Sequence, residues 1–311
     1  MTFKLPNLPS PRAGLHELAD FAEIAAWENG QVSEREIIAY LGRADDNDDN
    51  DGVNDAEEGA TNLLPEVMNE IERRVRACNG GYPFSLSSEG TVLRFDRSNV
   101  RIVESSVYRY LLLTTRLNML SNKIYSGLDG TLLLEELAAH VFKNYLGARS
   151  KSLVFGTAVP GAFKDKVENL CHALKEGVGF RNFDGSSTQS AVDDKLDAVA
   201  WIPFSDETPG QLIIVGQCKT GTNWRGLENQ MQPKQFATKW LKEPFLVTPL
   251  RVFCLSEAID RTRMKSTQIA CGILFDRCRL VDFCNGFDCT NIEKWTTAAF
   301  DSFNLGDLRI S

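Results

Sequence analysis

The 311-residue sequence has little histidine and lacks the short motifs of several large enzyme classes. Its three histidines are His16, His140 and His172, and the last two fall in expected helices without metal-ligand spacing. The sequence also lacks a GxSxG elbow, a GxxxxGK(S/T) phosphate loop and a Gly-rich dinucleotide fingerprint. Serine hydrolases, P-loop NTPases, NAD-dependent enzymes and histidine-centred sites therefore find no support in the sequence.

Long apolar runs and paired cysteines are missing as well. No run approaches the roughly 20 apolar residues that cross a bilayer, and prolines interrupt MTFKLPNLPSPRAG, where a secretory signal would be apolar. We therefore expect a cytoplasmic protein without membrane contact. Eight cysteines occur without a CxxC pair, and the spacings of six and five between Cys278, Cys284 and Cys289 match no common zinc module. Reduced, buried thiols are expected rather than disulfides.

The formal net charge of −8 comes from one short acidic run. Of 42 acids, eight lie in residues 45–58, and the remaining 34 balance 34 Lys and Arg, so a local basic groove is compatible with the composition. The run also resembles a calcium loop, but Asn47 takes the first ligand position, where such loops have Asp. We therefore expect residues 45–58 to form a solvated, mobile charged loop.

The first 125 residues predict a mainly helical module. Apolar residues at helical spacing indicate helices over residues 15–27, 33–41, 64–78 and 106–119, and Ser33 with Glu36 has the spacing of a capping box. No catalytic motif precedes residue 130. We expect residues 1–125 to regulate the protein or bind a partner, and residues 126–311 to form a second domain.

Residues 193–224, DDKLDAVAWIPFSDETPGQLIIVGQCKTGTNW, carry the most informative pattern. Residues 196–201 and 211–219 are rich in β-formers, and the acidic, Pro- and Gly-containing residues 206–210 between them indicate a turn. The pattern predicts an antiparallel hairpin.

Three polar side chains in this hairpin need an explanation. Gln217 and Lys219 share one face of their strand, Asp197 reaches the same face, and Cys218 points to the other. Burying such groups is costly unless they are paired or bind a cation. Asp197, the Gln217 side-chain oxygen and the Cys218 carbonyl suit Mg²⁺, while Lys219 would stabilise developing charge or orient and deprotonate a water. A buried Asp–Lys ion pair is the alternative.

Asp197 followed by Gln217-Cys218-Lys219 resembles the motif of the PD-(D/E)XK nuclease superfamily, with Gln in place of the commoner acid as in its Mrr-like branch. The resemblance implies a restriction-endonuclease-like α/β core with a central mixed sheet flanked by helices. The run EELAAHVFKNYLG in the helix expected over residues 132–146 is similar to the preceding Mrr-like helix, whose Glu often joins the metal site. Glu135 lies nearer the apolar face than Glu136, so we choose Glu135; a solvated acid near a helix N-terminus is the alternative for both.

The rest of the core follows the order that this resemblance implies. Residues 152–159, 245–255, 268–275 and 279–283 are expected strands, and residues 163–176 an expected helix. After the hairpin, polar side chains predict contacts with nucleic-acid phosphates, and Trp224 would stack on or wedge between bases. These side chains are Asn223, Trp224, Arg225 and Lys234. An ordinary amphipathic helix with Trp240 in the core is the alternative.

We therefore expect a Mg²⁺-dependent (or Mn²⁺-dependent) endonuclease that hydrolyses DNA phosphodiester bonds. The resemblance further implies defence against phage or foreign DNA, an ATPase or helicase subunit as partner, and a homodimer. The competing hypothesis is a non-catalytic nucleic-acid-binding or assembly subunit that retains the fold.

Overall fold

The computed structural model describes residues 3–10, 12–45, 53–98, 103–181 and 194–303. This part of the chain is a mixed α/β protein with ten helices and three sheets. The helices are α1 (Leu15–Asn29), α2 (Glu34–Asp45), α3 (Val53–Ala77), α4 (Val103–Arg116), α5 (Gly130–Leu146), α6 (Phe163–Leu174), α7 (Pro233–Trp240), α8 (Arg261–Cys271), α9 (Arg277–Asp282) and α10 (Thr290–Asp301).

The largest sheet has five strands in the order β10-β9-β8-β7-β6. They are β6 (Lys151–Val154), β7 (Ala198–Ile202), β8 (Leu212–Lys219), β9 (Leu250–Leu255) and β10 (Ile273–Phe275). Neighbours among β6, β7 and β8 are antiparallel, and those among β8, β9 and β10 are parallel. Two small sheets contain β1 (Gln31–Ser33), β2 (Phe84–Leu86) and β3 (Val92–Phe95), and β4 (Ile124–Tyr125) and β5 (Leu128–Asp129).

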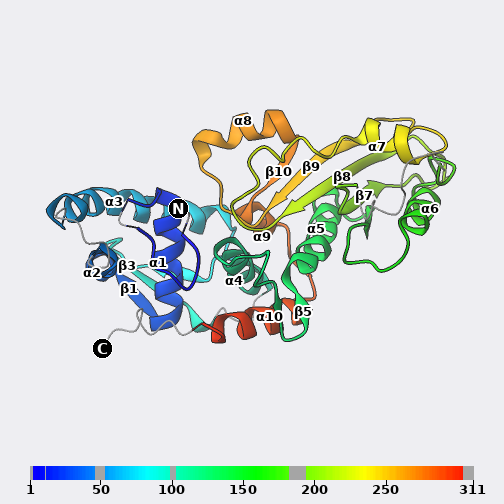
Figure 1. The fold of residues 1–311 in the computed structure, drawn as a ribbon. Helices are drawn as coiled ribbons and strands as arrows, with labels where there is room; N and C mark the ends of the chain where they lie inside the picture. Colours follow the sequence, from blue (N-terminus) through cyan, green and yellow to red (C-terminus); the bar gives the residue numbers. More distant parts are fainter. Residues whose placement is uncertain (1–2, 11, 46–52, 99–102, 182–193, 304–311) are drawn as a thin grey trace.

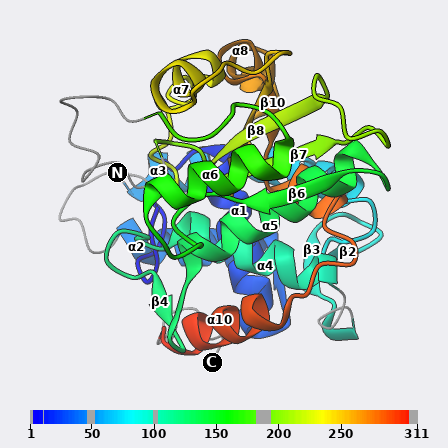
Figure 2. The same ribbon diagram turned by 90° about the vertical axis from the view of Figure 1, so that its right-hand side faces the viewer.

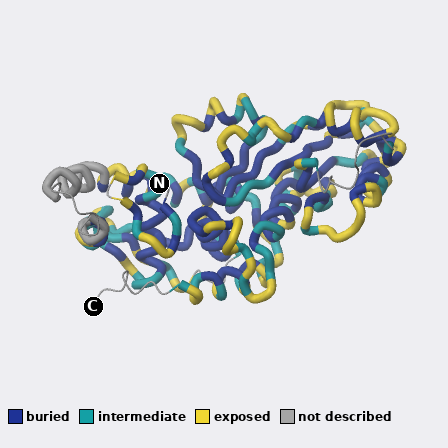
Figure 3. Tube along the Cα trace, viewed as in Figure 1, coloured by how far each residue is buried: buried dark blue, intermediate teal, exposed yellow. Residues whose placement is uncertain are grey.

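The molecule is elongated, with α1, α2 and α3 at one end and the five-stranded sheet at the other (Figure 1). Helices α4, α9 and α10 lie between these ends. Seen from the side in Figure 2, α7 and α8 lie on one side of the sheet, and α4, α5 and α10 lie on the other. The buried stretches, dark blue in Figure 3, run through α4 and the central strands. The mixed sheet flanked by helices is thus confirmed at this level of detail.

The predicted hairpin is present. Strands β7 and β8 pair antiparallel with Ala198 opposite Gly216, and their side chains alternate between two hydrophobic clusters. Ile214 joins Phe142 of α5 on one face, whereas Val215 joins Trp240 of α7 on the other. Because both faces are covered, the strands are apolar almost throughout.

Four expected strands are wrong in whole or in part. The strands expected over residues 152–159 and 245–255 are shorter, since β6 ends at Val154 and β9 begins at Leu250, and the other two are partly or mainly helical. Residues 279–283 lie mainly in α9, because the Asp276 side chain accepts a hydrogen bond from the Arg279 N–H at 3.2 Å and caps a helix there. Residues 268–271 end α8, and only 273–275 form β10. Gly272 separates them with a φ of 85°, and a Cβ there would lie 2.5 Å from the Arg251 carbonyl oxygen. Apolar content alone did not distinguish these short helical segments from strands.

Local capping signals in the first half of the chain are confirmed. The Ser33 Oγ accepts a hydrogen bond from the Glu36 N–H at 3.3 Å, and the Ser33 N–H donates to Glu36 Oε2 at 2.6 Å. This reciprocal pair starts α2.

The described residues of the acidic run are helical. Asp45 ends α2, and helix α3 begins at Val53, so residues 53–58 are helical rather than part of the expected loop. Residues 46–52 lie outside the described part of the chain.

A buried group of charges joins the N-terminal helices to the end of the sheet. We call Asp20, Glu23, Arg74, Arg116 and Arg277 the charge cluster; each is at most 1% exposed. Asp20 contacts Arg74 at 2.7 Å, Arg116 at 2.6 Å and Arg277 at 2.8 Å. Burial alone would raise the pKa of Asp20, but these arginines hold that pKa well below its usual range.

One hydrophobic cluster also spans the expected boundary at residues 125 and 126. It includes Phe21 of α1 and Leu111 of α4, together with Phe142 of α5 and Trp295 of α10. The two predicted units therefore share packing, and their functional division stays a prediction.

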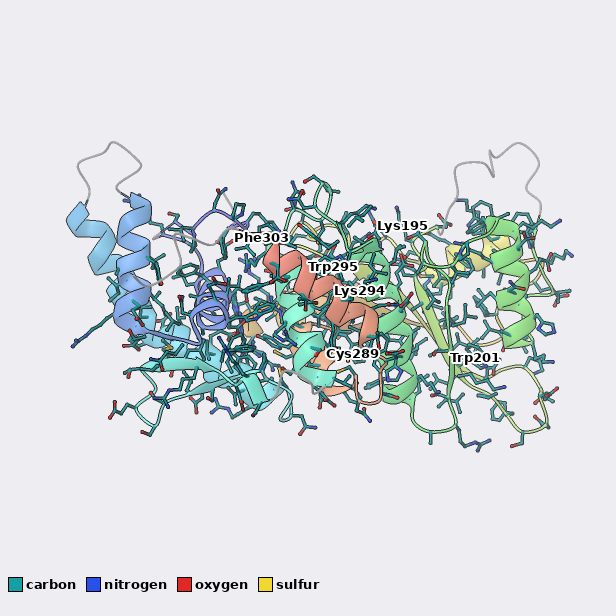
Figure 4. All side chains as sticks on the ribbon, turned by 90° about the horizontal axis from the view of Figure 1, so that it is seen from below. Lys195, Trp201, Cys289, Lys294, Trp295 and Phe303 are labelled. Carbon is teal, nitrogen blue, oxygen red and sulfur yellow. The ribbon has the colours of Figure 1, made fainter. Side chains whose placement is uncertain are left out.

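Helix α10 fixes the start of α5. Its Trp295 packs edge-on against Tyr110 and Tyr125, and the indole N–H donates to the Lys123 carbonyl at 2.9 Å. Figure 4 shows Trp295 on α10 from below. A Cβ on Gly130 would lie 2.5 Å from the Trp295 ring, so glycine permits this close approach. The contact positions the helix that carries Glu135.

Candidate active site

Helix α5, the ends of β6 and β8 and the start of β7 meet at one edge of the sheet and line part of a pocket of about 420 Å³, the polar pocket. β6 and β8 end at this edge and β7 begins there, because β7 runs antiparallel to both. Glu135 of α5, Thr157 after β6, Asp197 before β7, and Cys218 and Lys219 at the end of β8 all line it. All of them except Thr157 are candidate site residues predicted from the sequence.

Asp197 is held by the backbone on both sides. It is 7% exposed, and its Oδ2 accepts a hydrogen bond from the Cys218 N–H at 2.6 Å. Its own N–H donates to the Gly216 carbonyl at 2.9 Å, and its carbonyl accepts from Phe155 and Gly156. The carboxylate is therefore fixed at the point where β6, β7 and β8 meet.

Glu135 is fixed in a similar way from the helix. It is 6% exposed; its Oε1 accepts from the Thr157 hydroxyl at 2.9 Å and its Oε2 from the Ala158 N–H at 2.8 Å. A Cβ on Gly156 would lie 2.4 Å from Oε2, so the carboxylate needs glycine at that position. Glu136 is exposed and does not line the pocket. The geometry thus favours Glu135, as expected from the sequence.

Gln217 departs from the expected arrangement. It lies across from Asp197, one step beyond the Ala198–Gly216 pair, but it does not line the polar pocket. The side chain is 1% exposed and its Nε2 donates to Gln230 Oε1 at 3.2 Å, so the loop after β8 covers it. Its Oε1 is buried and has no hydrogen-bond partner among the described residues. A buried amide oxygen without a partner is costly, and a cation or water would satisfy it.

Lys219 lines the pocket and is half-buried. Within the described part of the chain, its ammonium makes neither a hydrogen bond nor an ion pair. The alternative interpretation, a buried Asp197–Lys219 ion pair, is therefore not what the structure contains. A positive charge left without a protein partner in a pocket is suited to meet a negative group of a ligand.

The Cys218 side chain serves packing rather than reactivity. A hydrogen bond with Cys254, then burial, raises the pKa of the Cys218 thiol well above its usual range. Cys218 packs beside the main hydrophobic cluster, and all eight cysteines are free, six of them buried. The part of Cys218 that was predicted to bind metal is its carbonyl, which remains a prediction.

The four residues predicted to contact nucleic acid do not lie together in the structure. Asn223 is exposed and lines the polar pocket, and Arg225 is exposed nearby. Trp224 is only 2% exposed, packs against Phe253 and donates its indole N–H to Glu257. The predicted base-stacking role of Trp224 is therefore wrong, because tertiary packing buries its ring.

Lys234, the fourth, is exposed in the first turn of α7 and lines a different pocket of about 1010 Å³. Two pocket residues without a sequence signal join the site instead. Thr157 holds Glu135, and Lys4 reaches the pocket from the N-terminal segment. No motif or spacing linked either of them to Asp197.

The donor set fits a hard divalent ion that keeps part of its water. Glu135 and Asp197 contribute carboxylate oxygens to one pocket, and the buried Gln217 oxygen has no hydrogen-bond partner in the described part of the chain. Mg²⁺ prefers such oxygen ligands and retains several waters. No group of three or more His, Cys, Asp or Glu within the described ranges has the geometry of a metal site. The carboxylate ligands of a divalent ion in this pocket would therefore be two, completed by water or a substrate phosphate.

Comparison with protein-family models, curated proteins and solved structures finds no match for this chain. No helix in the described part of the chain is both long enough and apolar enough to span a membrane.

Proposed function

We propose that this protein is a metal-dependent nuclease that hydrolyses DNA phosphodiester bonds at the polar pocket. One observation carries the proposal: Glu135, Asp197 and Lys219, from three separate segments, line one pocket. Two fixed carboxylates and a lysine that pairs with no residue of the described ranges form a set that phosphoryl chemistry can use. The match between this set and the PD-(D/E)XK motif supports the same proposal, including its restriction-endonuclease-like fold.

Each side chain has a separate task in this proposal. Glu135 and Asp197 would hold the divalent ion, Mg²⁺ or Mn²⁺, with Gln217 as a candidate third ligand. The ion supplies Lewis-acid polarisation of the phosphate and lowers the pKa of water. Lys219 faces the phosphate and stabilises the negative charge that grows on its oxygens, or orients the attacking water. Thr157 and the Ala158 N–H keep Glu135 in place.

The test is cleavage of plasmid DNA by the full chain with Mg²⁺, with and without a chelator. We expect cleavage that the chelator stops and that the Lys219→Ala variant lacks. Lys195→Ala is the matched control, since Lys195 is exposed before β7 (Figure 4). Cleavage by Lys219→Ala at the wild-type rate would overturn the assigned site. Defence against phage or foreign DNA, beside an ATPase or helicase subunit and as a homodimer, is the setting that the resemblance implies.

A second candidate is a non-catalytic nucleic-acid-binding subunit. The observation that favours it is Gln217, which is covered by Gln230 rather than lining the pocket. With two carboxylates alone, a metal would bind weakly in the free protein. DNA binding without cleavage under any divalent ion is the outcome that favours this candidate.

A further inference from the structure

The N-terminal segment before α1 is anchored on both sides of Lys4. The Phe3 N–H donates to Glu17 Oε1 at 3.1 Å, and the Phe3 ring packs edge-on against Phe21. The Leu5 N–H donates to the Arg116 carbonyl at 2.9 Å, and both Phe3 and Leu5 are buried. Lys4 is therefore held in place by its neighbours rather than carried on a loose end.

The Lys4 side chain extends into the polar pocket. It lines that pocket together with Glu135, Asp197 and Lys219, although it is far from them in sequence. Its Nζ donates to the Thr115 carbonyl at 2.6 Å, at the C-terminal end of α4, where a cation is favoured. The same Nζ lies 3.7 Å from the position of a Cβ on Gly221.

The loop that Lys4 approaches is also rigid. The Gly221 N–H donates to the Thr114 carbonyl at 2.9 Å and to Ser256 Oγ at 3.1 Å. Gly221 follows Lys219 by two residues, and Lys4, Lys219 and Gly221 all line the polar pocket. The pocket therefore holds two ammonium groups beside the carboxylates of Glu135 and Asp197, and an anionic group that enters it can contact both ammonium groups.

The contact between Lys4 and the end of α4 uses only part of the hydrogen-bonding capacity of Lys4. An ammonium has three donors, and the Thr115 carbonyl is the acceptor that the described residues offer. Burial, followed by the charge of Arg116, lowers the pKa of Lys4 to about 8. A helix C-terminus in water does not need a half-buried charge beside it. A phosphate ligand would accept hydrogen bonds from the two remaining N–H donors of Lys4.

We propose that Lys4 binds a backbone phosphate of the DNA strand, next to the phosphate that Lys219 meets. This inference rests on the proposed function, because it assigns the pocket a nucleic-acid strand as ligand. It also gives the N-terminal module a direct part in the site, since the segment that carries Lys4 is fixed by α1 and α4.

The variant that separates charge from structure is Lys4→Gln, because the amide can still donate to the Thr115 carbonyl but carries no charge. The probe is a short DNA duplex, and Ca²⁺ replaces Mg²⁺ so that binding is measured without cleavage. Fluorescence anisotropy is recorded between 50 and 200 mM salt. Lys294→Gln is the control, since Lys294 is exposed on α10 (Figure 4) and does not line the pocket.

Loss of one phosphate contact lowers the slope of log affinity against log salt by about 0.9. We therefore expect Lys4→Gln to bind about tenfold more weakly than wild type at 50 mM salt and about threefold more weakly at 200 mM. Lys294→Gln should keep both the affinity and the slope. A purely structural role for Lys4 would change the thermal midpoint without changing the slope.

The outcomes distinguish this inference from the proposed function. An unchanged slope in Lys4→Gln, with wild-type cleavage that Lys219→Ala abolishes, overturns the role of Lys4 alone. A reduced slope in a protein that never cleaves supports Lys4 and overturns the nuclease. Should Lys4→Gln fold poorly, Lys4→Met keeps the apolar stem without the charge; a slope reduced by about 0.9 supports the proposal, and a slope equal to that of wild type overturns it.

Discussion

In the charge cluster each of the three arginines contacts a carboxylate, whereas in the polar pocket Lys219 makes no ion pair with any described residue. The pocket carboxylates are held by backbone N–H groups and a threonine hydroxyl instead. Complementary charges that are fully buried and mutually paired stabilise one packing arrangement. Charges held apart by hydrogen bonds stay able to bind a ligand, so the same residue types serve structure in one region and are suited to chemistry in the other.

The largest expected effect separates the two regions by activity. Lys219→Ala should lower the cleavage rate by about a thousandfold, because a charge that acts in the transition state is lost. The free energy of unfolding should hardly change, since Lys219 has no protein partner among the described residues. Single-turnover cleavage and urea unfolding of the same samples measure both quantities. A large loss of stability would mean that Lys219 has a structural role, like the arginines of the charge cluster.

The next effect concerns stability. Arg277→Met leaves Asp20 buried with one partner fewer, and removing one member of a buried ion pair costs about 3–5 kcal/mol. Arg76→Met is the control, since the Arg76–Glu72 pair is exposed and should contribute little. Urea unfolding measures both variants. Equal, small effects would show that the charge cluster does not hold the two ends of the molecule together.

Gly156→Ala tests the positioning of Glu135 without removing any charge. The new Cβ would meet the Glu135 carboxylate at 2.4 Å, so the carboxylate has to move and activity should fall. Overpacking of this kind costs about 1–3 kcal/mol. Gly14→Ala is the control, because a Cβ there meets nothing within 4 Å. Full cleavage by Gly156→Ala, with normal stability, would mean that the observed position of Glu135 does not matter.

Gln217→Glu changes the ligand set by one negative charge. We expect tighter Mg²⁺ or Mn²⁺ binding to the free protein, because the Gln217 oxygen is buried and no described residue bonds to it. Without metal, the added buried carboxylate should lower the thermal midpoint. Calorimetry and thermal unfolding with and without metal check both expectations. Metal affinity that neither Gln217→Glu nor Asp197→Asn alters would exclude both side chains as ligands.

The smallest effect is a pH dependence of DNA binding. The ammonium of Lys4, with its pKa lowered to about 8, loses its charge as pH rises from 7 to 9, so wild-type affinity should fall several-fold. Lys4→Arg stays charged and should show less of this fall. Burial and Arg116 disfavour the charged form of Lys4, whereas Glu257, Asp20 and Glu17 favour it. Lys219, Glu135 and Asp197 are the other charged groups that line the same pocket. Parallel pH profiles for wild type and Lys4→Arg would exclude this titration.

Several elements could be predicted because their signals are local. The β7–β8 hairpin follows from two runs of β-forming residues around an acidic, Pro- and Gly-containing turn, and the start of α2 from the Ser33–Glu36 box. The helix α9 was missed because its cap at Asp276 outweighs the apolar content of a short segment. In each case a few neighbouring residues decide the backbone conformation.

By itself, the sequence determined which residues form the hairpin and which four candidate residues, Glu135, Asp197, Cys218 and Lys219, reach its end. Tertiary structure alone decided that Trp224 is buried, that Gln230 covers Gln217, and that Lys4 enters the pocket. Hairpin register and side-chain alternation depend on adjacent residues and are therefore visible in the sequence. Burial and pocket formation depend on how segments far apart in the chain pack together, and no local pattern records that packing.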